Sequence, residues 1–312
     1  MPQPLITRTL TVVPVPGSGA EDVLVGHDGT VYTGTADGSI WAVSSDGSQI
    51  RRVANTGGRP LGLEWLPDAQ ILVCDAREGL LVVGLLDGTV RTLTNSVDGV
   101  RMKFCNNAAV LDDGSIWFTD SSTRWGIEEW TSDLIEDTCT GRLLRLGPGA
   151  AEPETVLDGL SFANGVARSP DSSFVVVAET GHRRLHRHHV TGEQAGVTEV
   201  FVEDLPAHPD NIALGSDGLI WVTYASPKDP SLTFLQTRAK PWVRAAVRNA
   251  PEALKPKPKR TARVAAYDLD GLLVRDISAD ATHWHMATGV REHQGRVWLG
   301  SLVEPAIAWF DL

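Results

Sequence analysis

A turn followed by a short hydrophobic run recurs six times along the chain. The six units read HDGTVYTG from His27, PDAQILVCD from Pro67, DDGSIWFTD from Asp112, PDSSFVVVAET from Pro170, SDGLIWVTY from Ser216 and HQGRVWLGS from His293. Runs of Val, Ile, Trp, Tyr and Phe with partial alternation, bounded by Asp, Gly and Ser turns, are typical of β-strands. The pattern therefore predicts an all-β protein.

The spacing of these units predicts the architecture. Equivalent turn positions are separated by 40, 45, 58, 46 and 77 residues, close to or above the period of one four-stranded propeller blade. We therefore predict a six-bladed β-propeller that forms a single domain over residues 1–312. Pairing of an N-terminal strand, Ile6 to Val13, with Ala306 to Leu312 is expected to close the ring and remove exposed sheet edges.

Two segments interrupt the strand rhythm and lengthen two blades. Residues 121–140 contain the helix-compatible run GIEEWTSDLIED, and residues 226–261 contain a second such run around Trp242, which several prolines end. Both segments follow the second strand of a blade, so we expect short helical insertions that cap the ligand face. The second insertion is predicted to be a lid anchored by Trp242. Its basic residues make contact with a membrane surface the alternative.

Side chains that carry oxygen recur at one phase of the repeat. Eight residues before the equivalent turn positions lie Glu21, Leu61, Asn106, Asn164, Asp210 and Ala287. Such positions on the innermost strands of a propeller face one channel, so the four oxygen-bearing residues should converge. A hard divalent cation is the natural occupant of an oxygen cluster. Asn and Asp could instead cap these turns, but their common phase favours the cation.

Charge and composition limit the partners and the compartment. A net charge of −11 opposes binding to nucleic acid and to anionic membranes. No segment approaches the roughly 20 apolar residues of a membrane span, and the N-terminus lacks the pattern of a signal peptide. We expect a cytoplasmic protein whose partner is a small-molecule substrate, and its oligomeric state is unknown. Cys74, Cys105 and Cys139 are an odd set, and no His/Cys spacing resembles a zinc site.

Several stretches together resemble the strictosidine-synthase-like branch of the superfamily that includes regucalcin, gluconolactonases and paraoxonases. They are RPLGLEW (59–65), FTDSSTRW (118–125), TGRLLRL (140–146), FANGVARSPD (162–171), VVVAET (175–180), PDNIALGSDG (209–218) and the C-terminal REHQGRVWLGSLVEPAIA. The resemblance implies a six-bladed propeller with a divalent cation, usually Ca²⁺, on the channel axis. Another divalent cation is possible.

The resemblance also implies a ligand set. The family's metal ligands correspond to Glu21, Asn106, Asn164 and Asp210, and in the paraoxonase-like pattern Asn211 also approaches the metal. Two carboxylates and two carboxamides leave room for water or substrate on an ion that prefers 6–8 oxygens.

Departures from the family pattern affect the expected chemistry. The catalytic Glu of strictosidine synthase corresponds to Thr288, and the paraoxonase histidine pair has no match. Other histidines could act as a base. His283 and His285 are the first candidates because imidazole titrates near neutrality, and His182 and His208 are expected at the pocket. Four tryptophans in the loops are expected to supply apolar pocket walls, namely Trp125, Trp130, Trp242 and Trp284.

These features predict a metal-dependent hydrolase of a lactone or related ester. The cation would polarise the carbonyl, and Asp210 or a nearby histidine would take the proton from the attacking water. Two alternatives stay open. One is a biosynthetic enzyme that forms, cleaves or rearranges a carbon–carbon bond, and the other is a non-catalytic propeller with a structural calcium.

Overall fold

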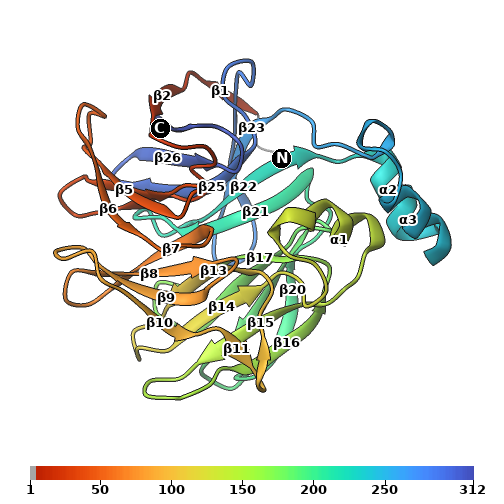
Figure 1. The fold of residues 1–312 in the computed structure, drawn as a ribbon, viewed down its shortest axis with the longest axis horizontal. Coiled ribbons are helices and arrows are strands. Elements are labelled where there is room, and N and C mark those ends of the chain that lie inside the picture. The colour runs from red at the N-terminus through yellow and green to blue at the C-terminus, as the bar shows by residue number, and fades with distance from the viewer. Residues whose placement is uncertain (1–4) are drawn as a thin grey trace.

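The strands form six blades of four antiparallel strands around a central channel, as predicted, and one further short strand is added to the edge of blade 5 (Figure 1). The computed structural model describes residues 5–312. Blade 1 contains β3 (Leu24–Val25), β4 (Val31–Gly34), β5 (Ser39–Val43) and β6 (Ile50–Asn55). Blade 2 contains β7 (Pro60–Leu66), β8 (Gln70–Asp75), β9 (Gly79–Gly84) and β10 (Val90–Thr94). Blade 3 contains β13 (Cys105–Val110), β14 (Ile116–Asp120), β15 (Gly141–Leu146) and β16 (Glu154–Leu160). A small hairpin, β11 (Ser96–Val97) and β12 (Val100–Arg101), lies between blades 2 and 3 in the chain.

The second half of the chain repeats this arrangement. Blade 4 contains β17 (Ala163–Arg168), β18 (Phe174–Glu179), β19 (Arg184–His189) and β20 (Thr198–Val202). Blade 5 contains β21 (Ala207–Leu214), β22 (Ile220–Pro227), β23 (Ala262–Tyr267) and β24 (Leu273–Ala279). Blade 6 contains β25 (Ala287–His293), β26 (Arg296–Ser301), β27 (Ala306–Asp311) and β2 (Thr11–Pro14). The first strand of each blade in the chain is the innermost one, except that β2 supplies the outer edge of blade 6.

The N-terminal segment closes the ring, but not as one strand. β2 pairs antiparallel with β27, which confirms closure by the two ends of the chain. The predicted strand from Ile6 to Val13 is divided, and its first part, β1 (Ile6–Arg8), pairs in parallel with β24 of blade 5. Ile6 and Leu10 both pack on the apolar cluster between blades 5 and 6, which includes Ile277 of β24. This packing explains why the segment crosses from one blade to the next.

Apolar side chains fill the spaces between neighbouring blades. Fully buried Val176 of blade 4 and Val222 of blade 5 belong to one such cluster, and equivalent clusters lie between the other blades. A further cluster, separate from these, joins the two insertions to the mouth of the channel through residues such as Phe104, Ile135 and Leu235. The core is therefore a ring of interfaces, and the insertions are packed on one end of it.

Threonine hydroxyls connect successive innermost strands near the channel. Thr119 donates to the carbonyl of Asn164 at 2.6 Å, Thr180 to that of Pro209 at 2.7 Å, and Thr223 to that of Thr288 at 2.7 Å. Thr288 in turn donates to the carbonyl of Glu21 at 2.8 Å. Because buried carbonyl groups require donors, these bonds hold blades 3, 4, 5, 6 and 1 in register.

Replacement of Thr119 by valine is expected to lower the free energy of unfolding by about 1–3 kcal/mol, because the carbonyl of Asn164 loses its short hydroxyl donor in a buried site. Thr119→Ser keeps the hydroxyl and removes only a methyl group, so it is the matched control and should cost less. Chemical denaturation of both variants checks this. Equal stability of Thr119→Val and the wild type would show that the bond contributes nothing.

The two insertions form the helices of the molecule. Residues 121–140 contain η1 (Ile127–Glu129) and α1 (Trp130–Glu136), and residues 226–261 contain α2 (Pro230–Arg238), α3 (Pro241–Arg248) and η2 (Glu252–Leu254). One helix was predicted in the second insertion, around Trp242, whereas α2 was not predicted. Asp229 begins α2 by accepting hydrogen bonds from two backbone amides, with proline at the first helical position. Figure 1 shows α1, α2 and α3 together at one edge of the propeller.

The helices are short. Within residues 5–312, none of them has the length and apolar character needed to cross a membrane.

Candidate metal centre and substrate cavity

A cavity at the capped end of the channel has an oxygen-rich floor. Glu21, Asn106, Asn164 and Asp210 all line it, and each is at least 91% buried. They come from the segment before β3 and from three innermost strands, β13, β17 and β21. The structure therefore brings together the four residues that share one phase of the repeat.

A register irregularity in each of these strands presents the ligand positions. The antiparallel pairing of β13, β17 and β21 with the next strand breaks at Asn106–Asn107, at Asn164–Gly165 and around Asp210–Asn211. Such bulges redirect side chains and are common beside functional sites. The first residue of each pair lines the cavity, and the second lies against a neighbouring innermost strand.

In every blade, the residue that follows the cavity-lining position is either polar or glycine, and the two kinds alternate around the ring. A Cβ on Gly165 would lie 2.6 Å from the Cα of Asn211, which is too close for any side chain, so glycine is required there. Gly62 faces Asn107 and Gly289 faces Asp22 in the same way. The polar partners hold the next strand: Asp22 accepts from the amide of Leu63, and Asn107 from that of Val166, both at 2.9 Å. Close strand contact thus fixes the floor of the cavity.

The two amide ligands are oriented by their nitrogen atoms. Asn106 Nδ2 donates to Ser121 Oγ at 2.9 Å, and Asn164 Nδ2 donates to Thr180 Oγ1 at 3.1 Å. Their Oδ1 atoms are buried and have no hydrogen-bond partner among residues 5–312. An unpaired buried oxygen is unfavourable unless another group binds it. These two oxygens therefore fit a cation.

The carboxylates point to the same occupant. Burial, and then the negative charge of Asp210, raises the pKa of Glu21 well above its ordinary value. Burial raises the pKa of Asp210 to about 7, against a lowering contribution from Asn164. Two buried acidic groups beside unpaired amide oxygens would be stabilised in their ionised form by a divalent ion. The donor set contains only oxygen, which suits Ca²⁺.

Asn211, also predicted as a metal ligand, lies next to Glu21, and its Oδ1 is buried without a hydrogen-bond partner among residues 5–312. Its side chain does not line the cavity, and its Nδ2 donates to both Glu21 oxygens, at 3.1 and 3.3 Å. It therefore positions the Glu21 carboxylate, and a direct bond to the metal remains only a prediction.

His208 is the histidine that the structure brings to the cavity. Its Nδ1 lies 2.9 Å from the carbonyl oxygen of Thr180, which can only accept, so Nδ1 carries the proton. Its Nε2 is buried and has no partner in the described part of the chain, so it presents a lone pair. Burial lowers the pKa of His208, which favours the neutral form. The feature of the sequence that pointed to His208 was its position directly before Pro209 and Asp210.

The other predicted histidines do not line this cavity. His283 is exposed, and His285 contacts Glu304 through Nδ1 and lies 3.3 Å from Arg260 through Nε2. His182 belongs to a separate polar cluster beside α1. The general-base role predicted first for His283 and His285 therefore has no support in the geometry, because neither side chain lines the cavity.

The predicted pocket residues divide into two groups. Trp130 and Thr288 line the cavity, whereas Trp125, Trp242 and Trp284 do not. Trp284 is buried between blades 5 and 6, where its Nε1 donates to the carbonyl of Ala306. Trp242 is 70% exposed on α3, and the guanidinium of Arg248 covers the ring of Trp125. The apolar walls come instead mainly from aliphatic and phenylalanine side chains that the sequence did not single out: Leu61, Phe104, Ile135, Phe162, Met286 and Leu302.

Comparisons with known proteins show the family of the chain. A profile of strictosidine synthases matches residues 106–193, and a profile of the N-terminal part of strictosidine synthase-like proteins matches residues 8–43. Protein strictosidine synthase-like 6 of Arabidopsis thaliana is 33% identical, over 94% of this chain and 78% of the plant protein. Adipocyte plasma membrane-associated protein of Homo sapiens is also 33% identical, over 92% and 74% of the two chains.

Solved structures of more distant sequence share the fold. A gluconolactonase from Xanthomonas campestris superposes with a TM-score of 0.70 at 17% identity, over 97% of this chain and 89% of that one. The calcium-binding protein regucalcin from Agrobacterium tumefaciens gives 0.69 at 13% identity, over 98% and 94%. At these identities the likeness shows the propeller alone.

Proposed function

The chain belongs to the strictosidine synthase-like family, and from that premise we propose that it is a calcium-dependent hydrolase of a lactone or related ester. The observation that carries the proposal is the floor of the cavity. Two carboxylates and two unpaired amide oxygens converge there beside a histidine with a free nitrogen. The gluconolactonase and the calcium-binding regucalcin, which share the fold, support the same assignment.

Glu21, Asn106, Asn164 and Asp210 would hold the cation. When bound, Ca²⁺ would act as a Lewis acid that polarises the substrate carbonyl and stabilises the developing negative charge. Asn211 keeps the Glu21 carboxylate in place through its two hydrogen bonds.

His208 is the general base in this proposal. Its Nε2 would accept the proton of the attacking water, while its Nδ1–H keeps donating to the carbonyl of Thr180, which fixes the tautomer and the ring orientation. Asp210 was the other predicted base. A cation at Asp210 lowers the basicity of that carboxylate, whereas Nε2 of His208, which lines the cavity, has no hydrogen-bond partner among residues 5–312 and is not a ligand of the proposed cation.

The walls favour a substrate with an apolar body. Phe104, Phe162 and Ile135 line the space above the oxygen floor, and Trp130 and Leu134 of α1 complete it. A lactone or aryl ester with a hydrophobic substituent would bury apolar area there, whereas a bare sugar acid would not.

Turnover of a panel of aliphatic lactones and aryl esters, with calcium and after chelation, tests the function. We expect hydrolysis of at least one apolar lactone or ester, loss of that turnover on chelation, and recovery when Ca²⁺ is returned. Turnover that survives rigorous chelation would contradict the metal role. Absence of turnover across the panel by calcium-loaded protein would contradict the hydrolase.

A biosynthetic carbon–carbon reaction is the second candidate, because the matching profile is that of strictosidine synthase. The position of the family's catalytic Glu is Thr288, whose buried hydroxyl donates to the carbonyl of Glu21. No carboxyl group is available at that position to act as acid or base, so condensation by that route is disfavoured. Cytoplasmic location and a small-molecule partner stay predictions.

The second insertion is proposed to be a lid, with anchors other than the one expected. Leu232 of α2 and Pro256, Lys257 and Pro258 after η2 line the cavity, whereas Trp242 faces solvent. Replacing residues 230–255 by a short Gly-Ser linker should raise KM or change the substrate range, because one wall is lost. The propeller should stay folded and bind calcium as before.

Trp242→Ser is the matched control for this truncation. It alters only an exposed side chain, so kinetics should not change. Unchanged kinetics in the truncated protein, together with loss of binding to anionic vesicles in both variants, would support membrane contact instead of a lid.

A further inference from the structure

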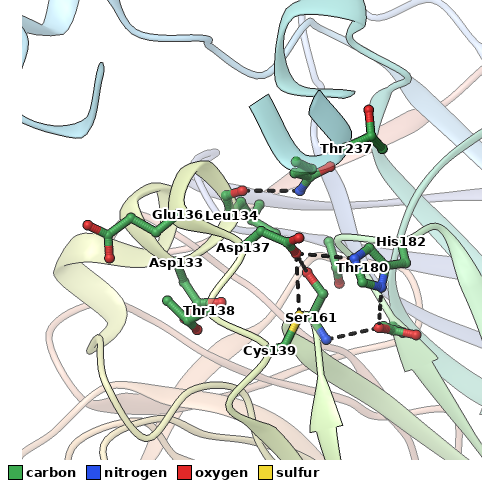
Figure 2. Close-up of polar contacts among 12 residues, drawn as sticks. Asp133, Leu134, Glu136, Asp137, Thr138, Cys139, Ser161, Thr180, His182 and Thr237 are labelled. Atoms are coloured by element: carbon green, nitrogen blue, oxygen red, sulfur yellow. Dashed lines mark hydrogen bonds and ion pairs between the residues drawn. The ribbon is translucent and has the colours of Figure 1, made fainter. Parts of the chain in front are cut away.

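A second cluster of metal-binding side chains lies beside the cap, outside the cavity. Asp137 and Cys139 follow α1, and His182 lies in the turn between β18 and β19. Figure 2 shows these three side chains and Ser161 pointing toward one another. His182 Nε2 lies 3.2 Å from Asp137 Oδ1, and Cys139 Sγ lies 3.6 Å from the same oxygen. One ligand atom from each residue lies within 4.8 Å of the other two.

The imidazole of His182 is held from its other side. Its Nδ1 lies 2.8 Å from Glu179 Oε1, and the Glu179 side chain is fully buried. A carboxylate on the second ring nitrogen is the usual partner of a metal-binding histidine, because it fixes the tautomer and the direction of the ring. Nε2 is therefore directed at Asp137 and Cys139.

The loop after α1 adopts an unusual backbone to present the other two ligands. Asp137 has φ of 51° and Cys139 has φ of 49°, both in the left-handed region that non-glycine residues rarely occupy. Ser161 Oγ donates to Asp137 Oδ1 at 2.6 Å, and Arg244 lies 3.7 Å from the opposite oxygen, Oδ2. Strain of this kind persists where the surrounding contacts require it, as at ligand sites.

We propose that Asp137 Oδ1, Cys139 Sγ and His182 Nε2 bind Zn²⁺ or a similar borderline transition metal. Zinc bonds of about 2.0–2.3 Å in a tetrahedral site place neighbouring ligand atoms about 3.3–3.7 Å apart. The two distances on Asp137 Oδ1, 3.2 and 3.6 Å, are close to this range. Zn²⁺ replaces the thiol proton of Cys139 and any proton on His182 Nε2, and both pass to solvent. Water would fill the fourth position.

The site differs in chemistry from the oxygen cluster on the channel axis. A thiolate and an imidazole select zinc-like metals, and carboxylate and amide oxygens select calcium. The bound metal would connect the loop after α1 to blade 4. Because Trp130, Leu134 and Ile135 of α1 line the cavity, it would hold one wall of the cavity in place. The inference does not depend on the proposed hydrolase.

Titration of metal-free protein with Co²⁺, under anaerobic conditions and in excess Ca²⁺, tests the site. We expect one equivalent of Co²⁺ to give a sulfur-to-cobalt charge-transfer band, which Zn²⁺ displaces. The oxygen cluster holds no sulfur and cannot produce this band. Cys139→Ser should abolish it, and His182→Gln should weaken Zn²⁺ binding by at least about 10-fold, the lower limit seen when even an outer partner of a metal ligand is lost.

His189→Gln is the matched control, because His189 also pairs with a carboxylate on blade 4, Glu199, but lies outside the cluster. It should bind Co²⁺ like the wild type. Thermal unfolding without metal checks that each variant is folded, and Asp137→Asn is a second ligand variant. Absence of the sulfur band in the wild type, or wild-type Zn²⁺ affinity in His182→Gln, would overturn the proposal.

Discussion

Asp210→Ala is expected to lower calcium affinity by about 10–100-fold or more. It should also abolish turnover at micromolar calcium. It removes one of two carboxylates from the oxygen cluster, and loss of an outer partner of a metal ligand alone costs that much. Asn164→Ala should weaken binding in the same direction, because it removes an amide oxygen that is buried and otherwise unpaired among the described residues. Elemental analysis after gel filtration and calorimetric titration with Ca²⁺ measure both effects.

Asp276→Asn is the control for these variants. Asp276 is also a buried carboxylate, but it pairs with Arg263 at 2.6 Å on the outer strands of blade 5, away from the channel. It should retain full calcium occupancy. Full occupancy in both Asp210→Ala and Asn164→Ala would show that the converging oxygens do not form the cation site.

His208→Ala is expected to lower kcat by about 10²–10⁴-fold, the range typical of removing a general base, with a much smaller effect on KM. Calcium occupancy should not change, because His208 contacts the Thr180 carbonyl and contributes no oxygen to the cluster. The space left by the side chain should admit free imidazole, which should restore part of the turnover.

A purely structural role for His208 predicts a different result. Loss of its hydrogen bond to Thr180 would then lower stability in proportion to the activity lost, and imidazole would not rescue it. His208→Gln, which keeps a polar group of similar length, would in that case retain more activity than His208→Ala. If His208→Ala keeps the wild-type kcat, another group takes the proton of the attacking water, and Asp210 is the next candidate.

The convergence of the proposed calcium ligands could be predicted because a propeller repeats the same strand position around one axis. That position is shared by Glu21, Asn106, Asn164 and Asp210. Their equal spacing from the repeated turns therefore predicts that they converge, and all four line the cavity. The partners that orient them were not predictable. Whether Asn211 meets a metal or the Glu21 carboxylate depends on a bulge in β21, and no residue type in the sequence marks that bulge.

Loop residues were predicted less well, because a loop's direction depends on contacts distant in sequence. Trp242 and Trp284 looked equivalent in the sequence, yet one is 70% exposed and the other 1%. Asp137 and Cys139 come from the loop after α1 and His182 from the turn after β18, so their meeting required the packing of α1 on blade 4. His208 could have been preferred over His283, because it lies two residues before Asp210, which was already assigned to the channel.

The position of Glu21 joins ring closure to ion binding. Glu21 follows the strand β2 that completes blade 6, and its carbonyl accepts the hydroxyl of Thr288 from that same blade. An open ring, with the two chain ends apart, therefore lacks one of the four oxygen ligands. By thermodynamic linkage, an ion that binds only the closed form stabilises it by about 2.7 kcal/mol when its free concentration is 100 times Kd. The proposed calcium ion would therefore favour the closed ring, so that ring closure and ion binding are coupled.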